Sequence, residues 1–270
     1  MLDSVDLDGV VIATPHTLHF EQIMTCLAAD LHVLTEKPLA CRVDHAKQII
    51  RKAQQKKRVM MISYQRHFSA AFRLAKNMVE EGQLGKITFV TALQAQDWLR
   101  DTRGLWRQDP KLSGGGQIND SGSHLVDIIL WVTGLRPESV FARINNRGSK
   151  VDILSALTLR FRGGAIGTLS VVGDAPGWWE DIAFFGEDGS LFVRGDQLIH
   201  TSRDPKTGNA VTKELTAKSA YNSNFDKNFV ESILGKDEPQ TPPICGLRVI
   251  QLTEAAWESA KAGKPVKVLT

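Results

Sequence analysis

The sequence predicts an α/β domain over residues 1–67, followed by an α+β domain over residues 68–270. In the first part, short apolar runs alternate with amphipathic stretches, a pattern typical of parallel strands that are connected by helices. In the second part, closely spaced apolar runs are punctuated by Gly163-Gly164 and Asp188-Gly189, which are typical of hairpin turns. We therefore expect a parallel sheet first, and then a mostly antiparallel, open-faced sheet with helices on one face.

The first domain is expected to hold three strands and two helices. Apolar runs predict strands at 9–13, 31–35 and 58–62, and apolar residues at helical spacing predict helices at 17–29 and 42–56. Strands that are linked by helices in this way pair in parallel through right-handed crossovers.

The second domain begins with a predicted helix at 69–81 and a long strand at 87–98. A helix at 120–133 would place positions 120, 124 and 127 on one face, beside an apolar stripe. The remaining alternating or apolar runs predict strands at 139–147, 153–162, 165–172, 181–186 and 190–194, and helices at 223–234 and 245–262.

Composition excludes several classes of function. A chain of 270 residues with 42% hydrophobic residues can bury a core, and its dispersed charges, +3 in sum, argue against a nucleic-acid partner. Cys26, Cys41 and Cys245 have the spacing of neither a zinc site nor a disulfide framework. No apolar run reaches the length of a membrane span, so we expect no membrane association and a cytoplasmic location.

Three loops of the first domain are candidates for a binding site. Thr14-Pro15-His16, Glu36-Lys37-Pro38 and Tyr64-Gln65-Arg66 each follow a predicted parallel strand. Ligands bind at the carboxyl ends of such strands, so the three loops should converge on one rim. A lysine pressed against a bound cofactor there could exchange a proton near neutral pH, with His124 as a base that Asp120 orients.

Each of these residues also has a purely structural interpretation. Asp120 would suit a helix N-cap, His124 a polar first-turn position, and Glu36-Lys37 a solvated turn. Asp127 would make a structural hydrogen bond, and Gly114-Gly115-Gly116 is either a plain hinge or a substrate loop. Trp106, Trp178 and Trp179 could be core or dimer-face aromatics, an interpretation that we favour for Trp178 and Trp179. The joint occurrence of the motifs favours the functional interpretation.

In order and spacing, these motifs resemble the glucose-fructose oxidoreductase, inositol dehydrogenase and rhizopine catabolism (Gfo/Idh/MocA) family of oxidoreductases. The resemblance rests on Ala13-Thr14-Pro15-His16 with His19, on Glu36-Lys37-Pro38, and on the stretch from Gly114 through Asp120, Gly122, His124 and Asp127. It implies a Rossmann domain that binds NAD or NADP, and hydride transfer between the nicotinamide and a sugar, cyclitol or related polyol. It also implies a homo-oligomer, a dimer or tetramer, formed through the open face of the second sheet.

The resemblance further implies a role for each matching residue, and it requires no metal. Lys37 would bind and polarise the reacting oxygen, His124 would exchange its proton, and Asp120 would assist. The cofactor-facing residues would be Thr14, Pro15, His16, His19, Glu36, Lys37 and Gln65. The substrate-facing residues would be Lys37, Arg66, Trp106, Arg107, Asp120, His124 and Tyr221.

One family feature is absent from the sequence. The family pattern begins with a Gly-x-Gly-x-x-Gly turn that cradles the pyrophosphate, and no such turn precedes the strand at 9–13. We therefore expect a chain that lacks the N-terminal, Gly-rich half of the Rossmann domain, with a bare apolar strand edge and weak dinucleotide binding. The alternative is a non-catalytic sugar-sensing or interaction protein on the same scaffold. Neither the substrate nor the choice between NAD and NADP can be read from the sequence.

Overall fold

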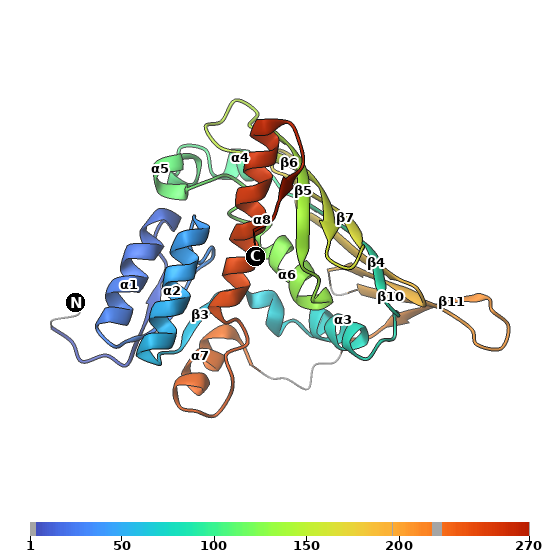
Figure 1. Ribbon diagram of the computed structural model, residues 1–270, viewed down its shortest axis with the longest axis horizontal. Helices are drawn as coiled ribbons and strands as arrows, with labels where there is room; N and C mark the ends of the chain where they lie inside the picture. Colours follow the sequence, from blue (N-terminus) through green and yellow to red (C-terminus); the bar gives the residue numbers. More distant parts are fainter. Residues whose placement is uncertain (1–3, 196, 218–222, 270) are drawn as a thin grey trace.

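The computed structural model describes residues 4–195, 197–217 and 223–269, and it has two sheets (Figure 1). The first sheet has three parallel strands in the order β1-β2-β3, which confirms the predicted parallel pairing. Its strands and the helices between them are β1 (Gly9–Ile12), α1 (His19–Ala28), β2 (His32–Thr35), α2 (Val43–Lys56) and β3 (Met60–Ile62). Short 3-10 helices, η1 (His16–Leu18) and η2 (Gln65–Phe68), lie after β1 and β3.

The outer edge of β1 is open in the described part of the chain, since β1 pairs there with β2 alone. Val10 and Ile12 point into the core, whereas Val11 between them is 63% exposed. The alternation follows from the two-residue period of a strand.

The second sheet has nine strands in the order β11-β10-β9-β8-β4-β7-β6-β5-β12. Every neighbouring pair is antiparallel except β4 and β7, which are parallel, so the predicted mostly antiparallel sheet is confirmed. The strands are β4 (Ile87–Ala95), β5 (Pro137–Asn145), β6 (Leu154–Phe161), β7 (Ile166–Val172), β8 (Trp179–Gly186), β9 (Gly189–Arg194), β10 (Gln197–Arg203), β11 (Ala210–Leu215) and β12 (Val266–Lys267).

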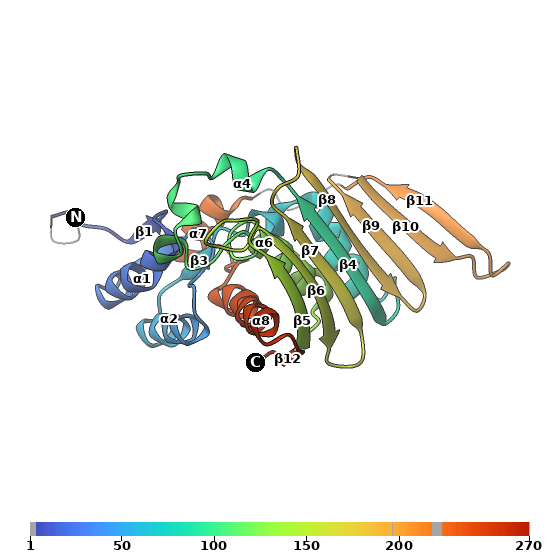
Figure 2. The ribbon, with the colours of Figure 1, turned by 90° about the horizontal axis from the view of Figure 1, so that it is seen from above.

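Helices lie on one face of this sheet, as expected for an α+β layer (Figures 1 and 2). Helix α6 (Gly122–Thr133) packs against β4 and helix α8 (Pro243–Ala262) against β5, while α3 (Ala70–Glu80) packs on α6. Helix α8 also contacts α2 and β3 of the first domain, and α7 (Phe225–Ile233) contacts β2. The large sheet, with α6 on its helical face, therefore adjoins the three-stranded sheet, and the candidate site lies between them.

Several boundaries differ from the sequence-based expectation. The strand predicted at 87–98 ends at Ala95, and Trp98 begins the short helix α4 (Trp98–Asp101). The structure adds a 3-10 helix, η3 (Trp106–Gln108), and α5 (Pro110–Ser113) before the glycines. Helix α6 begins at Gly122, two residues after Asp120, so Asp120 does not share its helical face.

Trp178 and Trp179 are 58% and 48% exposed, and a core role for them is wrong.

Among the helices of the described ranges, none combines the length and the apolar character needed to cross a bilayer.

Candidate active site

Lys37 and Asp120 form the centre of the candidate site. Lys37 is the second residue after β2, and its Nζ binds Oδ1 of Asp120, which lies in the turn before α6. The Lys37–Pro38 peptide bond is cis. Only 14% of the Lys37 side chain and 6% of the Asp120 side chain are exposed. A solvated turn at Glu36-Lys37 is therefore the wrong interpretation for Lys37, whose ammonium group is paired inside the protein.

The second carboxylate oxygen of Asp120 also has charged and polar partners. Trp98 donates its indole N–H to Oδ2 over 2.8 Å, and Arg107 donates its Nε–H to the same oxygen over 3.1 Å. Burial alone would raise the pKa of Asp120, but the charge of Lys37 and the hydrogen bonds from Lys37 and Trp98 outweigh it and hold the pKa below its usual value. Asp120 is consequently a carboxylate at every pH near neutrality.

Asp120 is not the N-cap of α6, which corrects the capping interpretation. Ser121 occupies the N-cap position of α6, and Asp120 accepts from Ser123 through its main-chain oxygen, not through its carboxylate. The carboxylate therefore binds Lys37, Trp98 and Arg107, and its influence on His124 is electrostatic.

His124 stands in the first turn of α6 and keeps part of its surface accessible. Its Nδ1 is buried and has no hydrogen-bond partner among the described residues. Burial lowers the pKa of His124 well below its usual value, and the positive charges of Lys37 and Arg66 lower it further. The imidazole is neutral at physiological pH, which is the form that can accept a proton.

His16 supports the same side of the site. Its Nδ1 lies 3.1 Å from the main-chain oxygen of Ser113, and its ring meets the Trp106 ring edge-on at 4.8 Å. The Arg107 guanidinium carbon lies over the Trp106 ring, 4.6 Å from the ring centre. Burial lowers the pKa of His16 to about 3, so His16 is neutral, and Lys37 and Arg107 are the positively charged partners of Asp120.

The other expected cofactor residues fall into two groups. Thr14, Pro15 and Glu36 are partly exposed at the rim and Gln65 is exposed there. His19, in contrast, is fully buried, and its Nδ1 and Nε2 lie 2.8 Å from the Pro38 oxygen and 2.9 Å from the Thr14 oxygen. His19 therefore lies behind the rim and connects two of its loops. Tyr221, an expected substrate residue, lies outside the described residues.

The glycines before Asp120 are required by close packing. A Cβ on Gly116 would lie 2.1 Å from the Asp152 main-chain oxygen, and a Cβ on Gly115 would lie 2.4 Å from the Trp257 ring. Asp152 accepts the main-chain N–H groups of Gly116 and Ile118, both over 2.9 Å. The plain-hinge interpretation is wrong, because these contacts fix the segment that leads to Asp120.

A second polar cluster was not identified from the sequence. Arg66 donates to Glu180 over 2.6 Å, and Gln94 donates to the same Glu180 oxygen over 3.2 Å. Gln94 and Glu180 face each other on β4 and β8. Along β4, Val90 and Ala92 occupy the same buried face as Gln94, so a polar residue at a core-facing position was the available signal.

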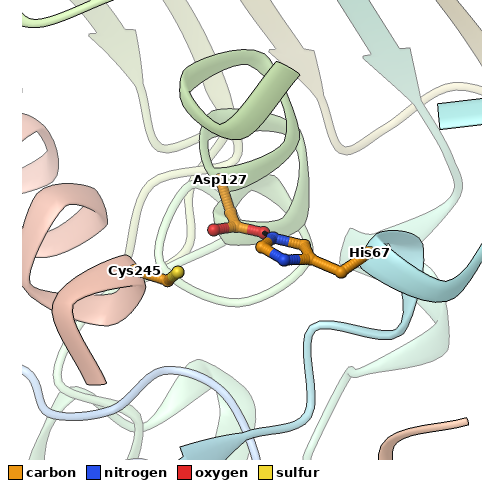
Figure 3. Close-up of side chains that lie close together, drawn as sticks. All are labelled: His67, Asp127 and Cys245. Carbon is orange, nitrogen blue, oxygen red and sulfur yellow. Dashed lines mark hydrogen bonds and ion pairs between the residues drawn. The ribbon is translucent and has the colours of Figure 1, made fainter. Parts of the chain in front are cut away.

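His67, Asp127 and Cys245 lie close together, and all three are buried (Figure 3). His67 Nδ1 lies 3.0 Å from the main-chain oxygen of Gln240, which can only accept, so this nitrogen carries a hydrogen. His67 Nε2 lies 2.7 Å from Asp127 Oδ2, a hydrogen-bond distance. Two ligands of one tetrahedral zinc ion would stand roughly 3.3 Å apart, given metal–ligand bonds near 2.0–2.1 Å.

Burial also raises the pKa of the Cys245 thiol, which disfavours the thiolate that a metal would bind. The cluster is therefore a hydrogen-bonded pair beside a thiol, and it ties η2, which carries Arg66, to α6, which carries His124. Asp127 thus has the structural hydrogen bond that we expected.

Comparisons with known proteins match both parts of the chain. A model described as the oxidoreductase family, NAD-binding Rossmann fold, matches residues 1–64, and one described as the GFO/IDH/MocA C-terminal domain matches residues 72–192. Levoglucosan dehydrogenase of Pseudarthrobacter phenanthrenivorans is 28% identical over 73% of this chain. The scyllo-inositol 2-dehydrogenase (NADP(+)) of Bacillus subtilis is 24% identical over 96% of this chain and 78% of its own length. A solved structure of levoglucosan dehydrogenase with NADH and levoglucosan superposes with a TM-score of 0.89 at 22% identity, covering 100% of this chain and 82% of that one.

The match with the levoglucosan dehydrogenase sequence spans 59% of that protein's length. Because the Rossmann model matches residues 1–64, the expectation that the chain lacks the N-terminal half of this domain is not borne out.

Proposed function

Because the chain belongs to the Gfo/Idh/MocA family of oxidoreductases, we propose that it is an NAD(P)-dependent dehydrogenase of a sugar, cyclitol or related polyol. The observation that carries the proposal is the grouping of a buried Lys37–Asp120 ion pair with the neutral His124. The group lies beside the loops that follow three parallel strands, where ligands of such sheets bind.

The residues at this rim fit a nicotinamide. Thr14 and Pro15 follow β1, Glu36 and Lys37 follow β2, and Gln65 follows β3, so the parallel strands bring all five to one edge. The buried Nδ1 of His124 has no hydrogen-bond partner among the described residues. A ligand bound at this rim would supply the missing partner. A nicotinamide bound here would supply the acceptor or donor of the hydride.

The side chains of the site divide the remaining work. The Lys37 ammonium group donates a hydrogen bond to the reacting oxygen and polarises it, and its ion pair with Asp120 holds it in position. His124, which is neutral, accepts the hydroxyl proton during oxidation, and the imidazolium that forms returns the proton in the reverse reaction. Trp98, Arg107 and His16 hold Asp120 and the adjacent wall in place.

Two further parts of the proposal concern organisation. We assign residues 1–67 to the cofactor domain and residues 68–270 to the substrate and oligomerisation domain. The sheet face that the helices leave open is the proposed subunit interface, since Ile166 and Phe192 on it are 47% and 40% exposed. A hollow of about 430 Å³ lies on this face, lined by Phe192, Leu93 and Arg194 among others. Size-exclusion chromatography with light scattering tests the expected dimer or tetramer, and a monomer at all concentrations would contradict it.

The enzymatic proposal is tested by following the absorbance of the reduced cofactor. The chain is mixed with NAD or NADP and a panel of sugars, cyclitols and linear polyols, beside the variants Lys37→Met and His124→Asn. Turnover with at least one polyol, and its loss in both variants, is the expected result. Binding of cofactor is measured separately by calorimetry. Sugar binding without dinucleotide binding or turnover would instead favour a sugar-sensing protein on this scaffold.

A further inference from the structure

The cluster of Arg66, Gln94 and Glu180 has polar atoms without hydrogen-bond partners in the described part of the chain. Arg66 Nη1 and Gln94 Oε1 are buried, and neither has a hydrogen-bond partner within the described ranges. The Gln94 side chain is fully buried, and its amide nitrogen must face Glu180, because a carboxylate only accepts. A buried polar atom without a hydrogen-bond partner destabilises the protein, so two of them beside a candidate active site indicate a missing polar ligand.

The cluster lies in the same site as His124. Gln94 is the penultimate residue of β4, and Gln96, the first residue after the strand, donates to Ser121, the neighbour of Asp120. Glu180 is the cross-strand partner of Gln94. Arg66 lies close enough to His124 for its charge to lower the pKa of that histidine. His124 Nδ1 is the third buried atom in this region without a described partner.

The charge of the cluster selects the kind of ligand. Glu180 already neutralises Arg66 over 2.6 Å, with 14% of the Arg66 side chain and 12% of the Glu180 side chain exposed. The free donor on Arg66 and the free acceptor on Gln94 together match a hydroxyl group, which both donates and accepts. A ligand carboxylate could not donate to Gln94 and would meet the like charge of Glu180, which carries a large penalty at partly buried sites.

We propose that Arg66, Gln94 and Glu180 form a subsite for a non-reacting hydroxyl group of the substrate, and that Glu180 makes this subsite selective for neutral sugars over sugar acids. The inference rests on the proposed function, because it concerns the substrate of the same site. Glu180 and Gln94 act here in specificity, and Lys37 and His124 carry the reaction.

The test uses pairs of sugars that differ only in a CH2OH or a carboxylate at one carbon: D-glucose with D-glucuronate, and D-galactose with D-galacturonate. Binding to the full chain is measured by thermal stabilisation over a concentration series, with kcat/KM as a second readout. We expect the neutral member to bind at least about 10-fold more tightly, and Glu180→Gln to reduce this ratio at least about 10-fold by freeing Arg66 for the carboxylate. Glu187→Gln, an exposed glutamate at the other end of β8, is the matched control and should leave the ratio unchanged.

A second variant keeps the charges of the cluster. Gln94→Leu removes the free acceptor, and we expect neutral sugars to bind at least about fivefold more weakly while the preference over sugar acids persists. Gln94→Leu alone decides the question if Glu180→Gln does not fold.

Two negative results can be told apart. Unchanged ratios in Glu180→Gln, or unchanged neutral-sugar affinity in Gln94→Leu, would overturn the subsite while the proposed function stands. Failure of the wild-type chain to bind or turn over any sugar of the panel would overturn the proposed function, and the subsite with it.

Discussion

Replacing Asp120 by asparagine isolates the contribution of the carboxylate to the site. Asparagine has nearly the same shape, but it leaves the Lys37 ammonium group, whose side chain is 14% exposed, beside a neutral amide. Removing one partner of a buried ion pair costs about 3–5 kcal/mol. Trp98 and Arg107 both donate to Oδ2, so an amide oxygen at that position can still accept two of the three hydrogen bonds, and the Arg107 side chain is 37% exposed. We therefore expect a loss of about 2–4 kcal/mol.

Urea unfolding at a series of pH values measures this loss. The pKa of Asp120 in the folded protein lies below its unfolded value of about 4, so the carboxylate stabilises the fold above that pH, and the contribution is lost as the pH falls. The stability gap between wild type and Asp120→Asn should be full above about pH 5 and should narrow below about pH 4. In the dehydrogenase assay, kcat/KM should fall about 100-fold or more, because Lys37 is no longer held as the hydrogen-bond donor.

Asp30→Asn is the matched control for this variant. Asp30 also binds a lysine, Lys56 over 2.9 Å, but on the surface, with 53% of the aspartate side chain exposed. It should change neither stability nor kcat/KM appreciably. Wild-type stability in Asp120→Asn, or a stability gap that does not depend on pH, would refute the assignment of Asp120 as the counter-charge of Lys37.

Three further variants test other parts of the site. His16→Asn keeps a donor for the Ser113 oxygen but cannot titrate. Because the pKa of His16 falls from 6.5 to about 3 on folding, the free energy of unfolding of the wild type should fall by about 2 kcal/mol more than that of the variant between pH 6.5 and 5. Urea unfolding measures both losses, and equal losses would contradict this expectation. Gly116→Ala places a Cβ 2.1 Å from the Asp152 oxygen and should lower the free energy of unfolding by at least about 3 kcal/mol, whereas a loss under about 1 kcal/mol would show that the segment can shift. Asp127→Ala leaves His67 Nε2 buried without its partner and should lower the free energy of unfolding by about 2–4 kcal/mol. Asp127→Asn can donate to that nitrogen and should lower it by less. The reverse order of the two variants would refute the hydrogen-bonded pair.

Elements with a strong apolar pattern could be predicted from the sequence, and exposed elements could not. The helix expected at 42–56 is found at Val43–Lys56, because Ala46, Ile49 and Ala53 repeat at helical spacing and are buried. Strand β11 has no buried residue, so its sequence contains no alternation that distinguishes it from a loop. It is a strand because its main chain pairs with β10, and such pairing depends on tertiary context.

The candidate site shows the same division. The types of residue at Lys37, Asp120 and His124 indicated proton chemistry, but the contact between Lys37 and Asp120 joins residues 83 positions apart. Gln94 and Glu180 are ordinary polar residues in the sequence, and only the register of β4 with β8 places them opposite each other. His19 matched a cofactor-facing pattern, yet its ring is fully buried. Main-chain oxygens lie beside both ring nitrogens, and a sequence pattern does not reveal such contacts.

The position of His19 has a consequence for how the rim responds to a ligand. One imidazole ring lies between the loop after β1, through the Thr14 oxygen, and the loop after β2, through the Pro38 oxygen. A displacement of Lys37 toward a substrate would therefore be passed through Pro38 and this ring to the Thr14 loop. The two loops are ordered together when the chain folds. The conformational entropy of ordering them is therefore lost on folding and not on ligand binding, and the rim is preorganised for its ligand.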